Sequence, residues 1–208
     1  ELLESLETLN WPDKTKNMQR NWIGKSEGSN IYFKLVGFED NVEVFTTRPD
    51  TIFGATYIVL APEHPLVNKI VHKDYSAKVN SYIESSRTKT EIERTSLVRK
   101  KTGVFTGAYA INPINNEKIS IWIADYVVIT YGTGAIMAVP SGDERDYEFA
   151  KKYNLPIIEV VSPDGKLHGN DKCFSEYGIC VNSGIYNGMH TKEVHKLINA
   201  ELENNDIS

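Results

Sequence analysis

The sequence predicts an α+β fold with a β-barrel-like core and peripheral helices. The 208 residues are 40% hydrophobic, which is enough apolar material to bury one sizeable core. Stretches with alternating or β-branched residues follow one another closely, above all between residues 103 and 140, and helical patterns are inserted between them. Strands in runs with interspersed helices are typical of an α+β domain, here with a closed or nearly closed barrel.

The first 23 residues differ from the rest of the chain. Recurrent leucines are followed by the most basic patch near a terminus, which comprises Lys14, Lys16 and Arg20. We expect residues 1–23 to form a connecting arm with short helices and residues 24–208 to form the functional domain. Because the chain begins without Met, we interpret it as a segment cut from a longer protein.

The first half of the domain predicts a hairpin, a further buried strand and two helices. Turn-forming residues at Gly37 and Asp40 separate the first two expected strands. Residues 88–98 are either a polar connector or another short helix. The expected elements are the strands Asn30–Leu35, Val42–Thr46 and Thr56–Leu60 and the helices Pro65–Val71 and Tyr75–Ser86.

The second half predicts a β-rich centre followed by two helices. Three or four strands are expected between Val104 and Pro140, with a turn at Asn112–Glu117. Pro156 is expected to stop the helix that precedes it. The remaining elements are a helix at Asp143–Tyr153, a strand at Ile157–Val161 and a C-terminal helix at Thr191–Glu203.

Composition and charge argue against a membrane protein and against a strong RNA binder. No apolar stretch approaches the roughly 18 residues that span a bilayer, and the N-terminal run lacks the pattern of a secretory signal. The net charge of −5 would repel nucleic acid. An RNA partner must therefore be held elsewhere or by local cations, namely Lys14, Lys16, Arg20 and the Arg99–Lys101 cluster.

The two cysteines, Cys173 and Cys180, have no histidine at metal-ligand spacing. So few cysteines in a domain of this size are typical of a reducing compartment such as the cytoplasm. We expect both to be structural thiols.

The segment FTTRPDT places several polar groups in one short loop. Pro49 fixes φ and Asp50 favours a tight turn after the strand that ends at Thr46, so three hydroxyls and several backbone groups crowd together. One interpretation is a polar lining for a pocket. The other, which the local pattern by itself favours, is an ordinary turn in which Asp50 or Thr51 caps the short segment TIFG.

The segment SGDERDYEFA begins the helix that follows the β-rich centre. Asp143 is a good N-cap, and acidic side chains at a helix start are favoured by the macrodipole. The same field is expected to keep Asp146 ionised, as suits a carboxylate that holds a ligand's ammonium group. Residues 131–140, which are small and apolar, read as a packed core strand that leads directly into this acidic start.

Other kinds of active site find less support. A metal site at Asp143, Glu144 and Asp146 is the less favoured interpretation, because no nearby histidine or second acidic cluster completes a coordination shell. The sequence also has no nucleophile elbow, Cys–His signature or phosphate-binding glycine loop. The histidines are scattered and are expected to be structural or superficial: His64, His72, His168, His190 and His195.

Four motifs together resemble the editing insertion of leucyl-tRNA synthetase of the bacterial or organellar kind: TTRPDT, KTGVFTGAYAINP, IWIADYVVITYGTGAIMAVP and ERDYEFA. The resemblance covers nearly the whole chain. It implies the fold shared by the valyl, isoleucyl and leucyl editing domains, with WPDKTKNMQRNWIGKSEG as the segment that leads in from the synthetic core. FTTRPDT distinguishes the leucyl family from these relatives, whose corresponding loop carries Trp near the threonines.

The resemblance also implies a role for each matching residue. Thr46 and Thr47 match catalytic threonines that contact the terminal adenosine and the scissile ester. Thr51 matches the residue that blocks leucine, and Asp146 matches the catalytic aspartate that binds the α-ammonium. The family usually has histidine where this chain has Gly142, so no histidine-assisted step carries over. The other substrate-binding residues implied are Arg48, Tyr131, Met137, Val139 and Asp143.

The implied activity is hydrolytic editing within a leucine–tRNA ligase. One methylene is worth only about 1–3 kcal/mol in an apolar pocket, so norvaline, isoleucine or methionine attached to tRNA(Leu) needs a second sieve. A positioned water would hydrolyse the ester without a covalent intermediate, and leucine would be excluded sterically.

The resemblance implies that the partners are the 3′-terminal adenosine of the mischarged tRNA, its amino acid and the rest of the synthetase. It implies no cofactor for editing, since ATP and Mg²⁺ serve the synthetic core, which this chain lacks. The chain by itself is therefore not expected to aminoacylate. Two alternatives remain open: a tRNA-end binding module with reduced or lost turnover, indicated by Gly142, and a metal-dependent hydrolase.

Overall fold

A single curled sheet forms the centre of the computed structural model, which describes residues 2–23, 28–95, 101–169 and 171–204. The sheet has six strands in the order β2-β1-β4-β5-β3-β6. A separate antiparallel pair joins β7 (Val161–Ser162) to β8 (Ile179–Cys180). The six strands are β1 (Ser29–Leu35), β2 (Asn41–Thr46), β3 (Tyr57–Leu60), β4 (Gly103–Ile111), β5 (Lys118–Ala124) and β6 (Ala135–Ala138).

The sheet closes almost into a barrel. β2 and β6 stand at opposite ends of the strand order, yet they lie against each other. Alternate residues of the first hairpin, such as Ile31, Phe33, Val42 and Val44, are fully buried inside it. This period-two burial follows from the pleat of a strand, and it confirms the predicted α+β fold with a barrel-like core.

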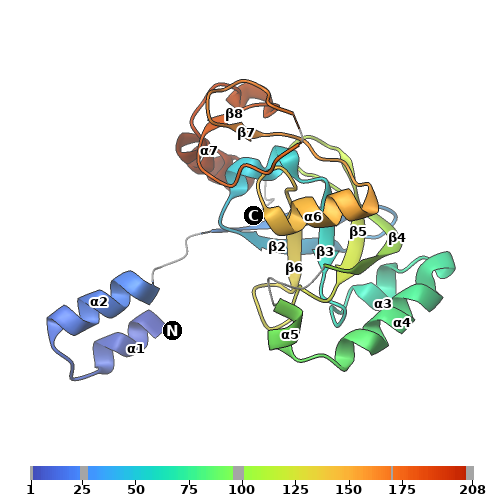
Figure 1. Cartoon of the computed structure of the whole chain (residues 1–208), viewed down its shortest axis with the longest axis horizontal. Helices are drawn as coiled ribbons and strands as arrows, with labels where there is room; N and C mark the ends of the chain where they lie inside the picture. The colour runs from blue at the N-terminus through green and yellow to red at the C-terminus, as the bar shows by residue number, and fades with distance from the viewer. Residues whose placement is uncertain (1, 24–27, 96–100, 170, 205–208) are drawn as a thin grey trace.

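Helices surround the sheet, as Figure 1 shows. The first two pack against each other and lie to one side of the sheet in that view. The α-helices are α1 (Leu2–Thr8), α2 (Asp13–Ile23), α3 (Val67–Ile70), α4 (Ser76–Arg87), α5 (Glu91–Thr95), α6 (Glu144–Tyr153) and α7 (Thr191–Asn204). Three short 3-10 helices are η1 (Pro49–Gly54), η2 (Lys73–Tyr75) and η3 (Gly184–Tyr186).

Most of the expected elements are present within one or two residues of their expected bounds. Short helices occupy the N-terminal arm, and the β-rich centre contains three strands in its described residues, β4 to β6. The expected turn at Asn112–Glu117 is closed by a hydrogen bond from the Asn112 amide to the Glu117 carbonyl, at 2.9 Å. The ambiguous segment 88–98 contains the short helix α5, and its residues 96–98 lie outside the described part of the chain.

One expected boundary is wrong. The strand expected over Ile157–Val161 pairs only from Val161 onward, because the apolar run before it is used for packing; Val160, for example, is fully buried. The helix expected over Asp143–Tyr153 does end at Tyr153, but the residue that ends it is Asn154, which adopts the left-handed conformation with φ 54°, two residues before Pro156.

One expected phosphate contact is also wrong. Lys101 is only 6% exposed, and its ammonium lies 5.9 Å from the centre of the Tyr126 ring. Arg99 and Lys100, the rest of that expected cluster, lie outside the described residues. Both cysteines are free thiols; Cys180 is buried and Cys173 half-buried. Within the described segments, no helix is both long and apolar enough to cross a membrane.

A layer of aromatic side chains beneath α6 fixes the position of that helix on the sheet. Phe149 is fully buried and stacks on Tyr57 of β3, with ring centres 5.4 Å apart. Trp122 of β5 and Tyr153 pack at the edge of the same group. The Tyr57 hydroxyl also donates to the main-chain carbonyl of Asp146, at 3.0 Å. The first turn of α6 is thereby held rigidly over one end of the barrel.

Candidate functional site

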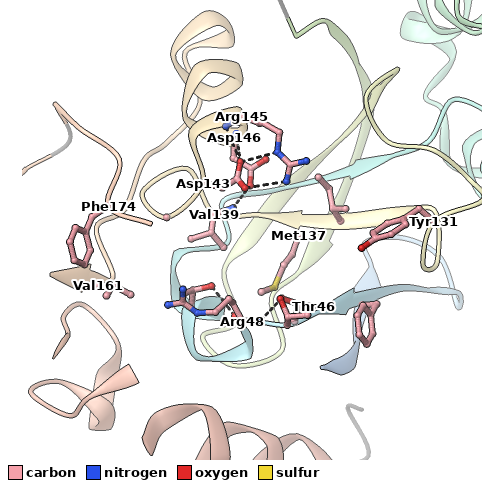
Figure 2. A pocket seen from close by; sticks show the side chains of 15 residues that line it. Thr46, Arg48, Tyr131, Met137, Val139, Asp143, Arg145, Asp146, Val161 and Phe174 are labelled. Atoms are coloured by element: carbon pink, nitrogen blue, oxygen red, sulfur yellow. Dashed lines mark hydrogen bonds and ion pairs between the residues drawn. The ribbon is translucent and has the colours of Figure 1, made fainter. Parts of the chain in front are cut away.

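A cavity of about 280 Å³ lies between the threonine loop, defined as Thr46–Thr51, and the start of α6 (Figure 2). Every predicted site residue lines it, although these residues come from three separate parts of the sequence. The set is Thr46, Thr47, Arg48, Thr51, Tyr131, Met137, Val139, Asp143 and Asp146. The structure therefore brings the predicted residues together, while their chemical roles stay predictions.

Six further residues line the cavity and were missed from the sequence. Four adjoin predicted residues along the chain and could have been found by that proximity: Phe45, Ile136, Gly142 and Arg145. The other two, Val161 and Phe174, come from distant segments and carry no local signal of a site. Only folding places them here.

The threonine loop is held by hydrogen bonds within itself. The Arg48 amide donates to Thr46 Oγ1 at 3.0 Å, and the Thr51 hydroxyl donates to the Arg48 carbonyl at 2.9 Å. A hydroxyl has one proton, so Thr51 has none left for a ligand and presents mainly bulk, whereas Thr46 accepts here and keeps its own proton. η1 has no side-chain cap, so the capping interpretation of Asp50 and Thr51 is wrong.

Asp50 is instead the anchor of Arg48. Its carboxylate is fully buried and receives the Arg48 guanidinium in a two-pronged pair, with the closest N–O distance 2.9 Å. His195 Nδ1, from α7, lies 3.8 Å from the same carboxylate. The guanidinium also stacks over the Tyr177 ring, 4.4 Å from its centre. A buried carboxylate requires such pairing, so this arrangement stabilises the loop.

Asp143 is the N-cap of α6, as predicted. Its carboxylate accepts from the amides of Arg145 and Asp146, at 2.8 and 3.2 Å, and pairs with the Arg145 guanidinium at 3.1 Å. Burial works to raise the pKa of Asp143, but the hydrogen bonds and positive charge of Arg145 outweigh it and hold this pKa below its ordinary value. Asp143 is therefore a fixed negative charge beside the cavity.

Asp146 lies deeper and is held differently. It is 5% exposed; Oδ2 accepts from the Val139 amide at 2.9 Å, while Oδ1 is buried with no hydrogen-bond partner in the described part of the chain. Burial and the neighbouring charge of Asp143 raise the pKa of Asp146 to about 8. The expectation that the helix field keeps Asp146 ionised is thus wrong for the empty cavity, because desolvation outweighs it.

The remaining wall is apolar. Met137 and Val139 are almost fully buried, whereas Tyr131 is 82% exposed at the rim. In Figure 2 Tyr131 lies at one end of the cavity, and Val161 and Phe174 lie at the other. A Cβ built on Gly142 would meet only Val139, no closer than 3.7 Å, so the fold leaves room for a side chain at position 142.

The cavity lining contains neither a histidine nor a cysteine. Across the described residues, no three histidine, cysteine, aspartate or glutamate side chains gather in a way that could hold a metal ion. What the lining offers is a buried carboxyl with one unpaired oxygen, two hydroxyls at the end of a strand and an apolar wall.

Comparisons with known proteins identify the family. A sequence model of the family "Leucyl-tRNA synthetase, editing domain" matches residues 20–203. The chain is 50% identical over 207 residues to a leucine–tRNA ligase of Clostridium tetani (strain Massachusetts / E88), covering 100% of this chain and 25% of that protein.

A solved structure has the same fold. The crystal structure of the ternary complex of Agrobacterium radiobacter K84 LeuRS with tRNA and LeuAMS matches with a TM-score of 0.73 and 33% identity. It covers 98% of this chain, which spans 22% of that one. The chain thus spans about a quarter of the length of the relatives that it matches. With the family model, the identity and the fold in agreement, the chain belongs to the family of leucyl-tRNA synthetase editing domains.

Proposed function

We propose that this chain hydrolyses the ester that joins a non-cognate amino acid to the 3′-terminal adenosine of tRNA(Leu), and that it spares leucine. The observation that carries this proposal is the unpaired, buried Oδ1 of Asp146 at the wall of a cavity whose other wall is the threonine loop. A buried polar oxygen without a partner is costly unless a ligand supplies the donor. An α-ammonium group is such a donor.

Binding of the substrate ammonium would be coupled to the loss of the proton from the Asp146 carboxyl. Burial, followed by the charge of Asp143, raises the pKa of Asp146 to about 8, which favours the protonated carboxyl near neutral pH when no cation lies beside it. A cation placed against Oδ1 favours the ionised carboxylate, so the amine would bind as an ammonium–carboxylate pair. This pairing fixes the α-carbon and, one bond away, the ester carbonyl.

Hydrolysis itself needs no protein nucleophile. A water oxygen attacks the ester carbonyl carbon, the tetrahedral intermediate collapses with the ribose oxygen as leaving group, and the proton of the water passes to that oxygen. The hydroxyls of Thr46 and Thr47, which line the cavity, would orient the water and the ribose, and such positioning supplies much of the rate. Thr51, whose hydroxyl is already used, limits the side chain by bulk.

The rest of the parent ligase would charge the tRNA with leucine and provide most of the tRNA contacts. The tRNA in the Agrobacterium structure supports tRNA as the partner. A cavity of about 280 Å³, at the small end of ligand pockets, suits an amino acid and its ester better than a larger ligand. We expect this activity in the compartment where tRNA is charged, the cytoplasm or an organelle.

The test is deacylation of norvalyl-tRNA(Leu) by a full-length leucine–tRNA ligase that carries this domain. Asp146→Asn keeps the shape but removes the charge, and we expect the rate to fall about 30-fold or more. Asp74→Asn, at a carboxylate that is 79% exposed and does not belong to the cavity lining, is the matched control. Unchanged deacylation by Asp146→Asn would refute the ammonium site.

Two further arms separate the alternatives. A chelator should leave deacylation unchanged. Loss of deacylation in the presence of the chelator would indicate a metal-dependent hydrolase. Wild-type protein that binds the aminoacylated adenosine without releasing amino acid would indicate a binding module.

A further inference from the structure

We propose that Phe174 is a specificity-determining residue of the cavity and that Arg48 is the positioning residue that holds it there. The inference rests on the proposed function, because it concerns the size of the amino acid that the cavity accepts. In this inference Arg48 supports the wall of the cavity and does not contact the RNA. Phe174 and Arg48 are far apart in the sequence. The proposal rests on the contacts between the two segments that contain them.

Phe174 belongs to the same end of the cavity as the ammonium site. Its amide donates to the Ser141 carbonyl at 2.8 Å, which ties it to the segment that runs from Val139 to the N-cap of α6. Val139 in turn donates its amide to Asp146 Oδ2. An amino acid whose ammonium lies on Asp146 would carry its side chain on the adjacent α-carbon, inside the cavity that Val139, Val161 and Phe174 help to line.

The wall opposite Tyr131 is therefore formed by three apolar side chains. Val139 and Val161 are buried, at 6% and 3% exposed, and Phe174 is half-buried. In Figure 2 Phe174 and Val161 lie together, beyond Val139. Of the three, Phe174 is the largest. Val161 belongs to β7 and Val139 directly follows β6, whereas Phe174 lies in a segment without regular secondary structure, so its position depends on what holds that segment.

Arg48 holds it from the side of the threonine loop. Nη1 donates to the Ser175 carbonyl at 3.5 Å, and the guanidinium lies 4.4 Å from the centre of the Tyr177 ring. Lys192 of α7 lies 5.2 Å from the same ring. The segment from Phe174 to Tyr177 thus spans the two walls of the cavity, bound to one at Ser141 and to the other at Arg48.

Three of the five N–H donors of the guanidinium are already engaged within the protein. The donors form a rigid fork, and Nε and Nη2 are engaged by the fully buried Asp50 while Nη1 reaches Ser175. Figure 2 shows the Arg48 side chain extending away from Thr46, toward the side where Val161 lies. A residue fixed in this way is suited to positioning a wall.

The experiment compares norvaline and leucine in a full-length leucine–tRNA ligase that carries this domain. Phe174→Ala should raise the rate of leucyl-tRNA deacylation relative to norvalyl-tRNA by about tenfold or more, since the two amino acids differ by one methyl group. Arg48→Lys keeps a charge for Asp50 but loses the fork, and should shift the same ratio in the same direction by a smaller factor, with KM for tRNA unchanged. Phe38→Ala, on an exposed ring at the other end of the β1–β2 hairpin from Thr46, should leave the ratio unchanged.

Two results decide the role of Arg48. If it acts through Phe174, the double variant should be no more permissive than Phe174→Ala alone. A raised KM for both tRNAs with an unchanged ratio would instead make Arg48 an RNA contact and overturn the assignment. Tyr177→Leu, which removes the stacking partner and leaves the Arg48–Asp50 pair intact, repeats the test should Arg48→Lys fail to fold.

A binding arm separates this inference from the proposed function. Norvaline and leucine amides of 3′-amino-3′-deoxyadenosine cannot be hydrolysed as esters, and their affinities report the cavity wall without turnover. Phe174→Ala should narrow the difference between the two affinities, and an unchanged difference would overturn the inference. Wild-type protein that binds these amides but does not deacylate tRNA would overturn only the proposed function.

Discussion

Two side chains show how single residues would set both the selectivity and the pH behaviour of this domain. Thr51 is 6% exposed and gives its one proton to the Arg48 carbonyl, so it has no proton to donate to a ligand and acts mainly by its volume. Asp146 is equally buried, but its Oδ1 has no hydrogen-bond partner among the residues that the structure describes. One residue narrows the cavity, and the other leaves an interaction for the ligand to complete.

Thr51→Ala should let the full-length enzyme deacylate correctly charged leucyl-tRNA(Leu). Removing a hydroxyl and a methyl group from a wall next to the amino acid gains space comparable to leucine's extra carbon, which corresponds to about 10-fold to 200-fold in rate. The measurement is release of leucine from purified leucyl-tRNA(Leu). Protection of that product at the wild-type level would contradict the steric role.

Asp146 should make the stability of the folded chain fall as pH rises. Its pKa is about 8 in the folded state against 3.8 for the ordinary group, so between these values the folded state binds a proton that the unfolded state does not. The free energy of unfolding should therefore decrease by at most about 1.4 kcal/mol per pH unit from this group and level off above pH 8.

Urea unfolding at pH 5, 6, 7 and 8 checks this, with Asp146→Asn as the reference because it cannot titrate. Asp143 does not interfere in this range, because its pKa is lowered and its contribution is lost only in acid. Wild type and variant with parallel stability profiles would show that Asp146 is already ionised at pH 5.

At the scale of elements, short pieces of helix position the loops that border the cavity. α5 has only five residues, yet it delivers Arg94, which is 7% exposed, against the segment that follows β5. Arg94 donates to the carbonyls of Asp125 and Val127, at 2.6 and 2.8 Å, and pairs with Glu63 at 2.8 Å. This segment leads on to Tyr131 at the cavity rim.

Arg94→Met should destabilise the chain by about 2–4 kcal/mol. The substitution leaves the carbonyls of Asp125 and Val127 and the partly buried carboxylate of Glu63 without the guanidinium that they now bind. Arg87→Met is the matched control: that guanidinium is 62% exposed and pairs with Glu84, and its loss should cost less than about 0.5 kcal/mol. Chemical denaturation of both variants gives the comparison. Equal stabilities would mean that the network around Arg94 contributes nothing.

At the scale of the whole molecule, charge determines how the domain meets RNA. The net charge of −5 opposes binding to a polyanion, and Lys101, part of the expected basic cluster, is buried. The proposed ester site therefore depends on a partner surface to bring the tRNA end to it.

The isolated 208-residue chain should bind an acceptor-stem RNA hairpin only weakly, with Kd of about 10⁻⁴ to 10⁻⁶ M. The salt dependence should be shallow, with a log–log slope no steeper than about −2, because few phosphates are neutralised. Fluorescence anisotropy between 50 and 200 mM salt provides both numbers. Nanomolar affinity with a steep slope would contradict this prediction.

Local pattern determined most of the fold. The period-two burial of β1 and β2, the turn at Asn112–Glu117 and the N-cap at Asp143 all follow from interactions between residues close in sequence. The prediction of a strand at Ile157–Val161 was wrong because contacts between residues far apart in sequence decide that segment. Its apolar residues fit a strand, but the tertiary structure uses them as packing, which no local rule distinguishes.

The sequence by itself also determined the two halves of the site, since FTTRPDT and ERDYEFA each carry their polar groups within a few residues. Three features were decided only by the tertiary structure: the facing of these two segments across one cavity, the addition of Val161 and Phe174 to its lining, and the burial of Asp146. Burial depends on atoms contributed by every neighbouring element. For that reason the helix field, which the sequence reveals, pointed to an ionised Asp146, while desolvation, which only the fold creates, raises its pKa to about 8.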